Sequence, residues 1–343
     1  MKRSLAYDDV LLVPQYSDIR SRSEIETDTD LGNGLALELP LLSSPMDTIS
    51  EKEMAVSLAA AGACSVIHRY NTIEQQTVMV SSAIEEIGPS ARVGAAVGVS
   101  GDFLNRASVM RAIGASFICV DVAHGHHILM KEALQTLRTA LGDDLHIMAG
   151  NVATLQGIND LADWGANSVR CNIGGGSICS TRIQTGHGMP GLETIFECAK
   201  TDRDVTIIAD GGIKNSGDIV KALAAGADAV MVGSMLAGTD ETPGNMLQDS
   251  DGKKWKVYRG MASKEAQMDW RGRYSSFEGV ATRVPYRGPV EVILEDIERG
   301  IRSGFSYSGA RNLKELHAVA RFVSQTSSGI SESKTHILAR SWK

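Results

Sequence analysis

Residues 171–182, CNIGGGSICSTR, place a cysteine in surroundings that can make a thiol reactive. Cys179 lies shortly after three consecutive glycines and has Ser177, Thr181 and Arg182 close to it in the sequence. A thiolate reacts in a polar setting that is rich in hydrogen-bond donors, whereas a cysteine within an apolar core is inert. The spacing leaves two interpretations open, a nucleophile and a small packing residue.

The other four cysteines lie in different surroundings. Cys64, Cys119 and Cys171 fall within apolar runs, and Cys198 falls on a helical stretch, so we interpret them as small core residues. The total of five is odd, and no pair has the CxxC spacing of a metal site. This usage is typical of reduced thiols, so we expect a cytoplasmic protein.

Two glycine-rich stretches are suited to binding a phosphate group. Residues 209–219 (ADGGIKNSGDI) and 231–238 (MVGSMLAG) each end a strand-like run with glycine. Glycine lets the backbone approach a ligand closely and point its amides at phosphate oxygens. One such pair could merely permit a tight turn, but two on consecutive strands favour a phosphate site. Asp210 is placed to accept hydrogen bonds from sugar hydroxyls, and a turn cap is the alternative.

Short apolar runs must position these residues. They span residues 41–46, 64–68, 93–99, 117–123, 146–152, 168–173, 206–212 and 229–234. Amphipathic stretches such as 51–62 and 216–228 separate most of them. Near-continuous apolar strands alternating with helices indicate parallel strands covered on both faces, and eight such units predict a closed (β/α)8 TIM barrel of the α/β class. Glycines 62, 114, 165 and 226 are expected to end the preceding helices.

Two segments are too long for simple connections. Residues 174–191 follow the sixth strand as a glycine-rich loop, and residues 239–288 follow the eighth as a polar flap. Both start at the carboxyl ends of strands, the face on which barrel enzymes carry their chemistry. We expect residues 1–343 to form one barrel domain with a flexible tail from about 325 to 343.

Composition excludes several classes of protein. The 343 residues carry a formal net charge of −7, and no basic block is longer than DGKKWK, which argues against a nucleic-acid partner. No apolar run approaches the roughly 20 residues that cross a bilayer, and the first ten residues are not a signal peptide, so we expect no membrane partner.

The chain resembles the IMP dehydrogenase/GMP reductase family along essentially its whole length. The motifs that carry the resemblance are GGGSICSTR (174–182), LAYDDVLLVP (5–14), SSPMDT (43–48), AGNVAT (149–154), ADGGI (209–213), VGSMLAGTDETPG (232–244) and YRGM (258–261). The resemblance implies a purine nucleoside monophosphate bound over the barrel mouth. Cys179 would attack C2 of the purine to form a covalent intermediate, and hydride would pass between C2 and a nicotinamide.

The resemblance also implies a role for residues around the cysteine. The phosphate would meet Ser177, Gly211, Gly212, Gly233, Ser234 and Tyr258. Asp210 would hold the ribose. The base would be surrounded by Ser44, Met46, Gly260, Met261 and Glu278. The nicotinamide side would consist of Asp121, Ala123, Asn151 and Arg170. Family members often hold potassium on loop carbonyls, here those of Gly174, Gly176 and Cys179, and a homotetramer is expected on the same ground.

Several features favour the reductase branch, which converts GMP to IMP and ammonia with NADPH. Residues 68–99 run without the tandem cystathionine-β-synthase-type modules that dehydrogenases usually carry, although some dehydrogenases lack them. The segment from Gly260 to Glu278 is much shorter than a dehydrogenase flap. Thr181 and Glu278 would handle protons for the departing ammonia, because a carboxyl beside a hydroxyl can relay a proton to an amine.

Other features keep two alternatives open. Arg273 and Tyr274 resemble the pair with which dehydrogenases activate water, so an IMP dehydrogenase that oxidises IMP to XMP with NAD+ is the first alternative. The second is a non-catalytic nucleotide-binding barrel. The loop also departs from the family pattern, with Gly175 where proline is usual, His187 where an apolar residue is usual and Gly191 where glutamine is usual. These departures leave open a modified or deoxy purine substrate.

Overall fold

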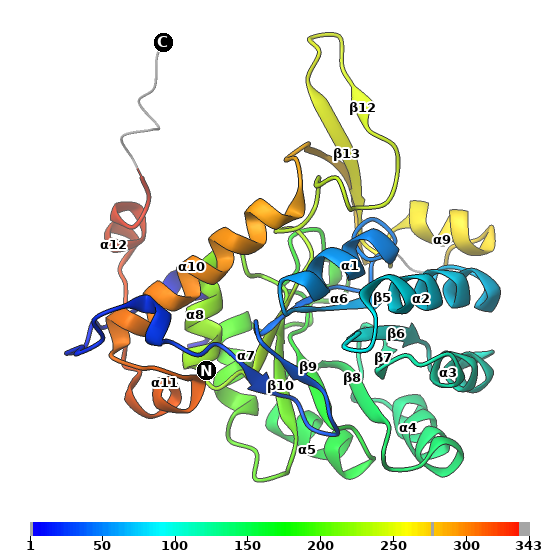
Figure 1. Cartoon of the computed structure of the whole chain (residues 1–343), viewed down its shortest axis with the longest axis horizontal. Coiled ribbons are helices and arrows are strands. Elements are labelled where there is room, and N and C mark those ends of the chain that lie inside the picture. The colour runs from blue at the N-terminus through cyan, green and yellow to red at the C-terminus, as the bar shows by residue number, and fades with distance from the viewer. Residues whose placement is uncertain (1–2, 276–277, 336–343) are drawn as a thin grey trace.

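Eight parallel strands close into a barrel in the computed structural model, which describes residues 3–275 and 278–335 (Figure 1). In chain order the barrel strands are β4 (Leu41–Ser43), β5 (Cys64–Ile67), β6 (Val93–Val97), β7 (Phe117–Asp121), β8 (His146–Val152), β9 (Ser168–Cys171), β10 (Thr206–Asp210) and β11 (Ala229–Val232). Each strand pairs with its sequence neighbours, and β11 pairs with β4 to close the ring. The predicted (β/α)8 TIM barrel is confirmed.

Helices follow the strands and cover the outside of the barrel. They are α1 (Lys52–Ala60), α2 (Ile73–Ile87), α3 (Phe103–Ala112), α4 (Ile128–Leu141), α5 (Leu155–Asp163), α7 (Gly191–Cys198), α8 (Ser216–Ala224) and α10 (Val290–Ser308). The four glycines expected to end helices all adopt positive φ angles, from 71° at Gly62 to 114° at Gly165. Only glycine adopts this conformation without steric cost, so these residues stop each helix and turn the chain into the next strand.

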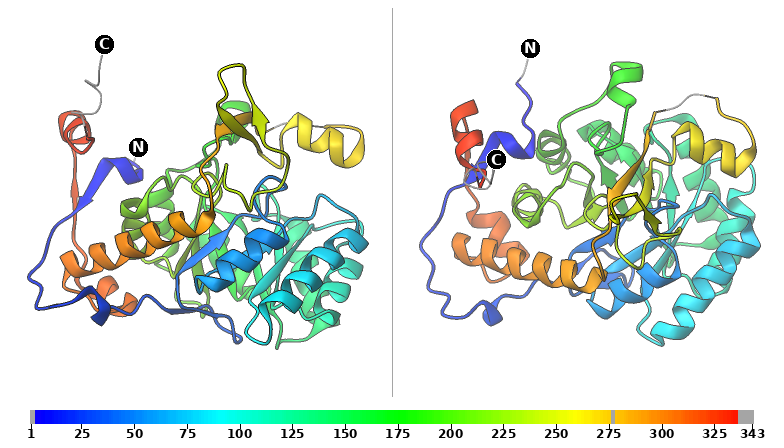
Figure 2. Two further views of the ribbon diagram at one scale, coloured as in Figure 1. Left: turned by 45° about the horizontal axis from the view of Figure 1, so that its top comes forward. Right: turned by 90° about the horizontal axis from the view of Figure 1, so that it is seen from above.

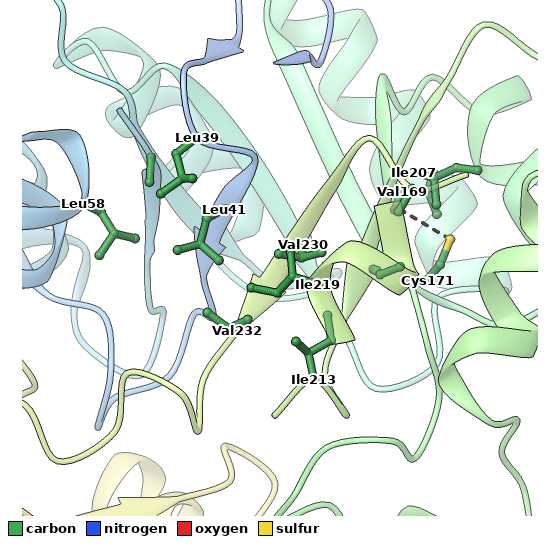
Figure 3. Close-up of a cluster of buried hydrophobic side chains, with 14 of the residues drawn as sticks. Leu39, Leu41, Leu58, Val169, Cys171, Ile207, Ile213, Ile219, Val230 and Val232 are labelled. Atoms are coloured by element: carbon green, nitrogen blue, oxygen red, sulfur yellow. Dashed lines mark hydrogen bonds between the residues drawn. The ribbon is translucent and has the colours of Figure 1, made fainter. Parts of the chain in front are cut away.

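Two apolar layers hold the barrel together, because alternate side chains of each strand point to opposite faces. Leu41 and Val230 point outward and pack with helix residues such as Leu58, whereas Leu42 and Met231 fill the barrel interior. Figure 3 shows the outer layer on strands β4, β9, β10 and β11. Leu41, Leu42, Val230 and Met231 are all fully buried, which explains why the strands are read from the sequence as continuous apolar runs.

A short hairpin closes the amino-terminal end of the barrel. Strands β2 (Thr29–Asp30) and β3 (Ala36–Leu37) place Leu31, Leu35 and Leu37 in the same cluster as the interior residues of the barrel. His146, the first residue of β8, contacts the carbonyl oxygen of Gly32 at 3.0 Å through Nδ1. This end is therefore plugged, and only the carboxyl end remains for a site.

The flap contains more regular structure than its polar sequence suggests. It forms an antiparallel sheet of β12 (Leu247–Gln248), β13 (Lys254–Arg259) and β14 (Ala281–Pro285), and α9 (Lys264–Arg271) lies between β13 and β14 in the chain. Figure 2 shows α9 and strands β12 and β13, in yellow, and β14, in orange, projecting beyond the barrel. Strand β14 is largely exposed, so its sequence lacks the apolar signal of a buried strand.

The two ends of the described chain pair with each other. Strand β1 (Val10–Leu12) pairs antiparallel with β15 (Phe322–Ser324). The short helix η1 (Tyr7–Asp9) precedes β1 in the chain, and η2 (Arg22–Glu24) follows it. Helices α11 (Leu313–Val319) and α12 (Ser327–Glu332) flank β15, so α12 occupies the first part of the tail expected to be flexible. The last part, residues 336–343, lies outside the described residues. Within the described chain, no helix combines the length and apolarity needed to cross a membrane.

Candidate active site

A cavity of about 500 Å³ opens at the carboxyl ends of the barrel strands. Its walls come from the carboxyl ends of β7 to β11, from loops that follow the barrel strands and from the flap. Every residue that the resemblance assigns to the substrate, the nicotinamide, the proton relay and the potassium loop lines it, so segments from Ser44 to Glu278 meet in one place. A single cavity of this size is typical of a small-molecule site.

The glycine-rich loop of residues 174–191, the cysteine loop, is held in place by the flap. Cys179 donates its amide to the carbonyl of Gly176 at 3.1 Å, forming a tight turn. Cys179 also forms a bridge with Gly279, and the amide of Ser180 donates to the carbonyl of Glu278 at 2.9 Å. The flap segment therefore runs antiparallel to the cysteine loop, which brings Glu278 beside residues almost 100 positions earlier in the chain.

A chain of hydrogen bonds leads from the thiol to a carboxylate. The Sγ of Cys179 donates to Oγ1 of Thr181 at 3.2 Å, and Oγ1 of Thr181 donates to Oε2 of Glu278 at 2.7 Å. A hydroxyl that accepts from one group and donates to the next can transfer a proton between them. The arrangement can take a proton from the thiol and return it to a group bound in the cavity.

The other four cysteines are buried, as expected for core residues. Burial raises the pKa of the Cys64 thiol and raises the pKa of Cys119 to about 11. Burial likewise raises the pKa of the Cys171 thiol. The thiols of Cys64, Cys119 and Cys171 therefore remain protonated at neutral pH. Cys179 is half-buried and faces the cavity.

Charged residues form a buried network on the wall expected to face the nicotinamide. Arg170 donates to Oδ1 of Asp121 at 2.7 Å and to Oδ2 of Asp210 at 3.0 Å, and Asn151 donates to the same oxygen of Asp210 at 2.8 Å. Burial by itself lowers the pKa of Arg170, but its interactions with the Cys119 sulfur and with the carboxylates of Asp210 and Asp121 outweigh burial and raise that pKa. The guanidinium therefore stays charged and fixes both carboxylates.

Hydroxyl groups and glycines converge where the phosphate is expected. The hydroxyl of Tyr258 lies 3.4 Å from Oγ of Ser177 and also hydrogen-bonds Ser234. Burial raises the pKa of Tyr258, so its hydroxyl keeps its proton and remains available as a donor. A Cβ on Gly233 would lie 3.3 Å from this hydroxyl, so glycine leaves room for a ligand oxygen.

The turn after β10 has the conformation that a phosphate-binding turn requires. Gly211 and Gly212 have φ angles of 84° and 76°, which only glycine adopts readily. The turn packs on the cysteine loop, since a Cβ on Gly212 would lie 3.1 Å from the carbonyl oxygen of Gly175. The two loops therefore form one continuous floor of the cavity.

An ion pair joins the flap to the barrel. Arg259, the last residue of β13, contacts Oδ2 of Asp47 at 2.6 Å, and the amide of Asp47 contacts Sδ of Met261 at 3.2 Å. The amide of Arg259 also donates to Oγ1 of Thr48 at 3.2 Å. These contacts position Tyr258, Gly260 and Met261 over the cavity.

Sequence reasoning missed several residues of the cavity wall. Arg69 and Tyr70 lie shortly after the end of β5, and Trp270 lies on α9, where its ring stacks on Tyr70 with centroids 5.9 Å apart. The position of Arg69 and Tyr70 at a strand end is a signal that could have identified them. Asn172, just after β9, also lines the cavity and was missed.

Arg273 and Tyr274, which resemble the water-activating pair of dehydrogenases, lie outside the cavity wall. Arg273 and Tyr274 are exposed, and neither side chain lines the cavity. The ammonium of Lys264 lies 4.9 Å from the centroid of the Tyr274 ring. The exposed His187 likewise lies outside the cavity wall.

Comparison with known proteins gives matches along the whole chain. The chain is 33% identical to inosine-5'-monophosphate dehydrogenase of Nitrosopumilus maritimus and 31% identical to GMP reductase of Leishmania major, and at least 98% of each chain is covered. These alignments run over 470 and 483 positions, so both relatives carry residues that this chain lacks. Relatives of both activities are therefore longer than this chain, so its shorter length does not by itself distinguish the two activities.

A solved structure is similar to this chain in fold as well as in sequence. A cysteine-to-alanine variant of GMP reductase from Trypanosoma brucei, in complex with guanosine 5'-monophosphate, superposes with a TM-score of 0.92 at 30% identity and covers 98% of both chains. Residues 4–336 match the IMP dehydrogenase / GMP reductase domain. With this match and the cysteine loop at the mouth of the barrel, the chain belongs to the IMP dehydrogenase/GMP reductase family of purine-nucleotide oxidoreductases.

Proposed function

We propose that this protein is a GMP reductase, which converts GMP to IMP and ammonia with NADPH through a covalent bond to Cys179. The observation that carries the proposal is the continuous path from the Cys179 thiol through Thr181 to Glu278. Release of ammonia from C2 needs a proton donor close to the nucleophile, and this path supplies one. The bound GMP of the related structure supports a purine nucleotide in this cavity.

The first step substitutes sulfur for nitrogen at C2. The thiol of Cys179 gives its proton to Thr181, which passes its own to Glu278, and the thiolate forms a bond to C2. The proton returns along the same path to the amino group, and the C2–N bond breaks to release ammonia. The thiol proton therefore leaves on ammonia, and the purine remains bound to sulfur.

The second step replaces sulfur by hydride. NADPH, when bound, supplies the hydride that C2 accepts. The C2–S bond then breaks, its electron pair returns to sulfur, and a proton restores the thiol. Asp121, Ala123, Asn151 and Arg170 would form the wall on which the nicotinamide rests. The rigid network around Arg170 fits this role because it fixes the orientation of the wall without a mobile charge.

The same proposal includes the ion and the assembly that the resemblance implies. The carbonyls of Gly174, Gly176 and Cys179 belong to the same glycine-rich loop, and they are hard oxygen donors of the kind that potassium prefers. Activity is expected to depend on potassium more than on sodium. A homotetramer and a cytoplasmic location are expected on the resemblance alone.

An IMP dehydrogenase is the competing candidate, favoured by Arg273–Tyr274 and by the relative of Nitrosopumilus maritimus. In that reaction the purine–sulfur intermediate is hydrolysed to XMP after NAD+ has accepted the hydride. The position of Arg273 and Tyr274 outside the cavity wall supports the reductase instead.

Two assay mixtures test the proposal directly. With GMP and NADPH, we expect loss of NADPH absorbance together with release of ammonia. Formation of NADH and XMP from IMP and NAD+, with no reaction of GMP, would overturn it in favour of the dehydrogenase. Cys179→Ala is expected to lower turnover by more than about 1,000-fold. Full turnover by that variant would remove the covalent mechanism, and a wild type inactive in both mixtures would support the non-catalytic barrel.

A further inference from the structure

The side chain of Asn172 lies where three segments of the active site meet. Asn172 directly follows β9 and is 4% exposed. Its Nδ2 donates to the carbonyl oxygen of Gly211 at 3.0 Å. A Cβ on Gly191, at the start of α7, would lie 3.5 Å from the same nitrogen. The amide thus links the base of the cysteine loop to the turn after β10.

Gly175 approaches this amide too closely to carry a side chain. A Cβ at position 175 would lie 2.2 Å from Nδ2, 2.6 Å from Oδ1 and 2.8 Å from Cγ of Asn172. These three atoms are the nearest neighbours of that Cβ, and all belong to the planar amide rather than to a flexible chain end. Gly175 is not among the glycines with positive φ, so its backbone conformation does not exclude alanine. The Asn172 amide is therefore the nearest obstacle to a side chain at position 175.

A contribution to the stability of the fold does not explain why asparagine stands at position 172. Its Oδ1 is buried and has no hydrogen-bond partner among the described residues. The orientation of the amide is fixed, because the carbonyl of Gly211 can only accept a hydrogen bond and must therefore face Nδ2. A buried acceptor without a donor destabilises a folded protein, so a residue that brings one is expected to have another role.

We propose that Asn172 is a positioning residue that fixes the cysteine loop against the Gly211–Gly212 turn, and that Gly175 is required because of it. The inference rests on the proposed function, since it assigns Asn172 to the alignment of Cys179 with the bound nucleotide. The amide acts in two ways. Its volume sets the path of residues 174–176, and its Nδ2 holds the turn on which the phosphate is expected to lie.

A double-variant experiment separates these two contributions. Gly175→Ala should slow alkylation of Cys179 by iodoacetamide about tenfold or more, because the new methyl group displaces the loop. The same change combined with Asn172→Ala should return the rate to within about threefold of the Asn172→Ala parent, because the obstructing atoms are gone. Cys179 is the only one of the five cysteines that is not buried, so alkylation reports on it directly.

Two matched controls make the rescue specific. Gly176→Ala places a Cβ 3.4 Å from the Cβ of Cys179 rather than near Asn172, so Asn172→Ala should not rescue it. Asn172→Asp keeps the volume of the amide, so it should not rescue Gly175→Ala either.

Asn172→Asp also tests the hydrogen bond to the turn. It replaces Nδ2 by an oxygen that faces the Gly211 carbonyl, so it should raise the KM for GMP about tenfold through loss of that hydrogen bond.

The outcomes decide the proposal whether or not the reductase assignment holds. Effects of Gly175→Ala that are the same with and without the Asn172 side chain would overturn it. If Gly175→Ala alone does not fold, recovery of folded protein in the double variant is the rescue, and failure of both to fold overturns the proposal. Asn172→Ala that lowers only the melting temperature, with alkylation and KM unchanged, would also overturn it. Alkylation needs no turnover, so failure of both nucleotide assays would remove the proposed function alone.

Discussion

At the scale of single residues, one hydroxyl group connects the reactive sulfur to a carboxylate. Thr181 accepts from Cys179 and donates to Glu278, and all three line the same cavity. The Glu278 backbone is fixed as well, because its amide donates to the carbonyl of Ala262 and its carbonyl accepts from Ser180. A proton relay of fixed geometry costs no rearrangement when the leaving group departs.

Replacement of the carboxylate should therefore remove proton transfer while leaving the shape of the site intact. Glu278→Gln is expected to lower turnover of GMP by about 100-fold or more, because an amide can neither store nor return the proton. The rate is followed by NADPH absorbance and ammonia release. Glu265→Gln, an equivalent change at an exposed position on α9, is the control and should retain full activity. Equal rates for the two variants would contradict the relay.

The exposed arginine of the flap gives a second test at this scale. Arg273→Ala should change GMP turnover by less than about twofold, because the side chain lies outside the cavity wall. A dehydrogenase that uses this arginine to activate water would instead lose most of its XMP formation. Steady-state rates in both assay mixtures, compared with those of Lys253→Ala at another exposed flap position, distinguish the two results.

At the scale of elements, the flap is a small sheet fastened to the barrel at its base. The pair Arg259–Asp47 joins the end of β13 to the loop after β4, and both side chains are at most 18% exposed. Tyr258 precedes this arginine and Met261 follows it closely, and both line the cavity. The ion pair therefore acts on the part of the site that covers the nucleotide.

Breaking this pair should weaken nucleotide binding. Arg259→Gln is expected to raise the KM for GMP about tenfold, because loss of a partly buried charged hydrogen bond loosens the flap over the cavity. Lys254→Gln, at an exposed position of the same strand, should leave KM unchanged. A lower melting temperature with an unaltered KM would show that the pair stabilises the fold without positioning the flap.

At the scale of the whole molecule, the plug at the amino-terminal end of the barrel contains a buried titratable group. His146 is 1% exposed, and burial lowers its pKa to about 4. Its Nδ1 lies 3.0 Å from the carbonyl oxygen of Gly32, which only accepts, so the neutral ring carries its hydrogen on Nδ1. The other nitrogen then accepts from the hydroxyl of Ser168 at 2.8 Å.

This histidine should make stability depend on pH. Its contribution is fully present above the unfolded pKa of about 6.5 and is lost as pH falls toward about 4, because the unfolded chain binds the proton first. The loss is on the order of 3 kcal/mol in the free energy of unfolding. Chemical denaturation between pH 7 and pH 4 should show a shallower slope for His146→Gln than for wild type. His187→Gln, at an exposed position, should match the wild type; an unaltered slope in His146→Gln would exclude this origin.

The sequence by itself determined the barrel and the face that carries the site. Strands such as residues 117–121 and 229–232 are buried on both faces, so their apolar runs are a local signal. Glycines such as Gly62 and Gly226 mark helix ends through backbone geometry that no other residue adopts easily. Since the carboxyl ends of parallel strands meet at one edge, motifs at those ends could be assigned to one site before any contact was known.

Only the tertiary structure decided which distant side chains touch. The distance between Thr181 and Glu278 and the stacking of Tyr70 on Trp270 depend on how the flap closes over the barrel, and the close approach of Gly175 to the Asn172 amide depends on how the cysteine loop folds back on itself. Local periodicity carries no information on the first two contacts, because they join residues about 100 and 200 positions apart in the chain and are fixed by packing. The exposed strand β14 escaped detection for a related reason, since a strand without a buried face leaves no apolar pattern.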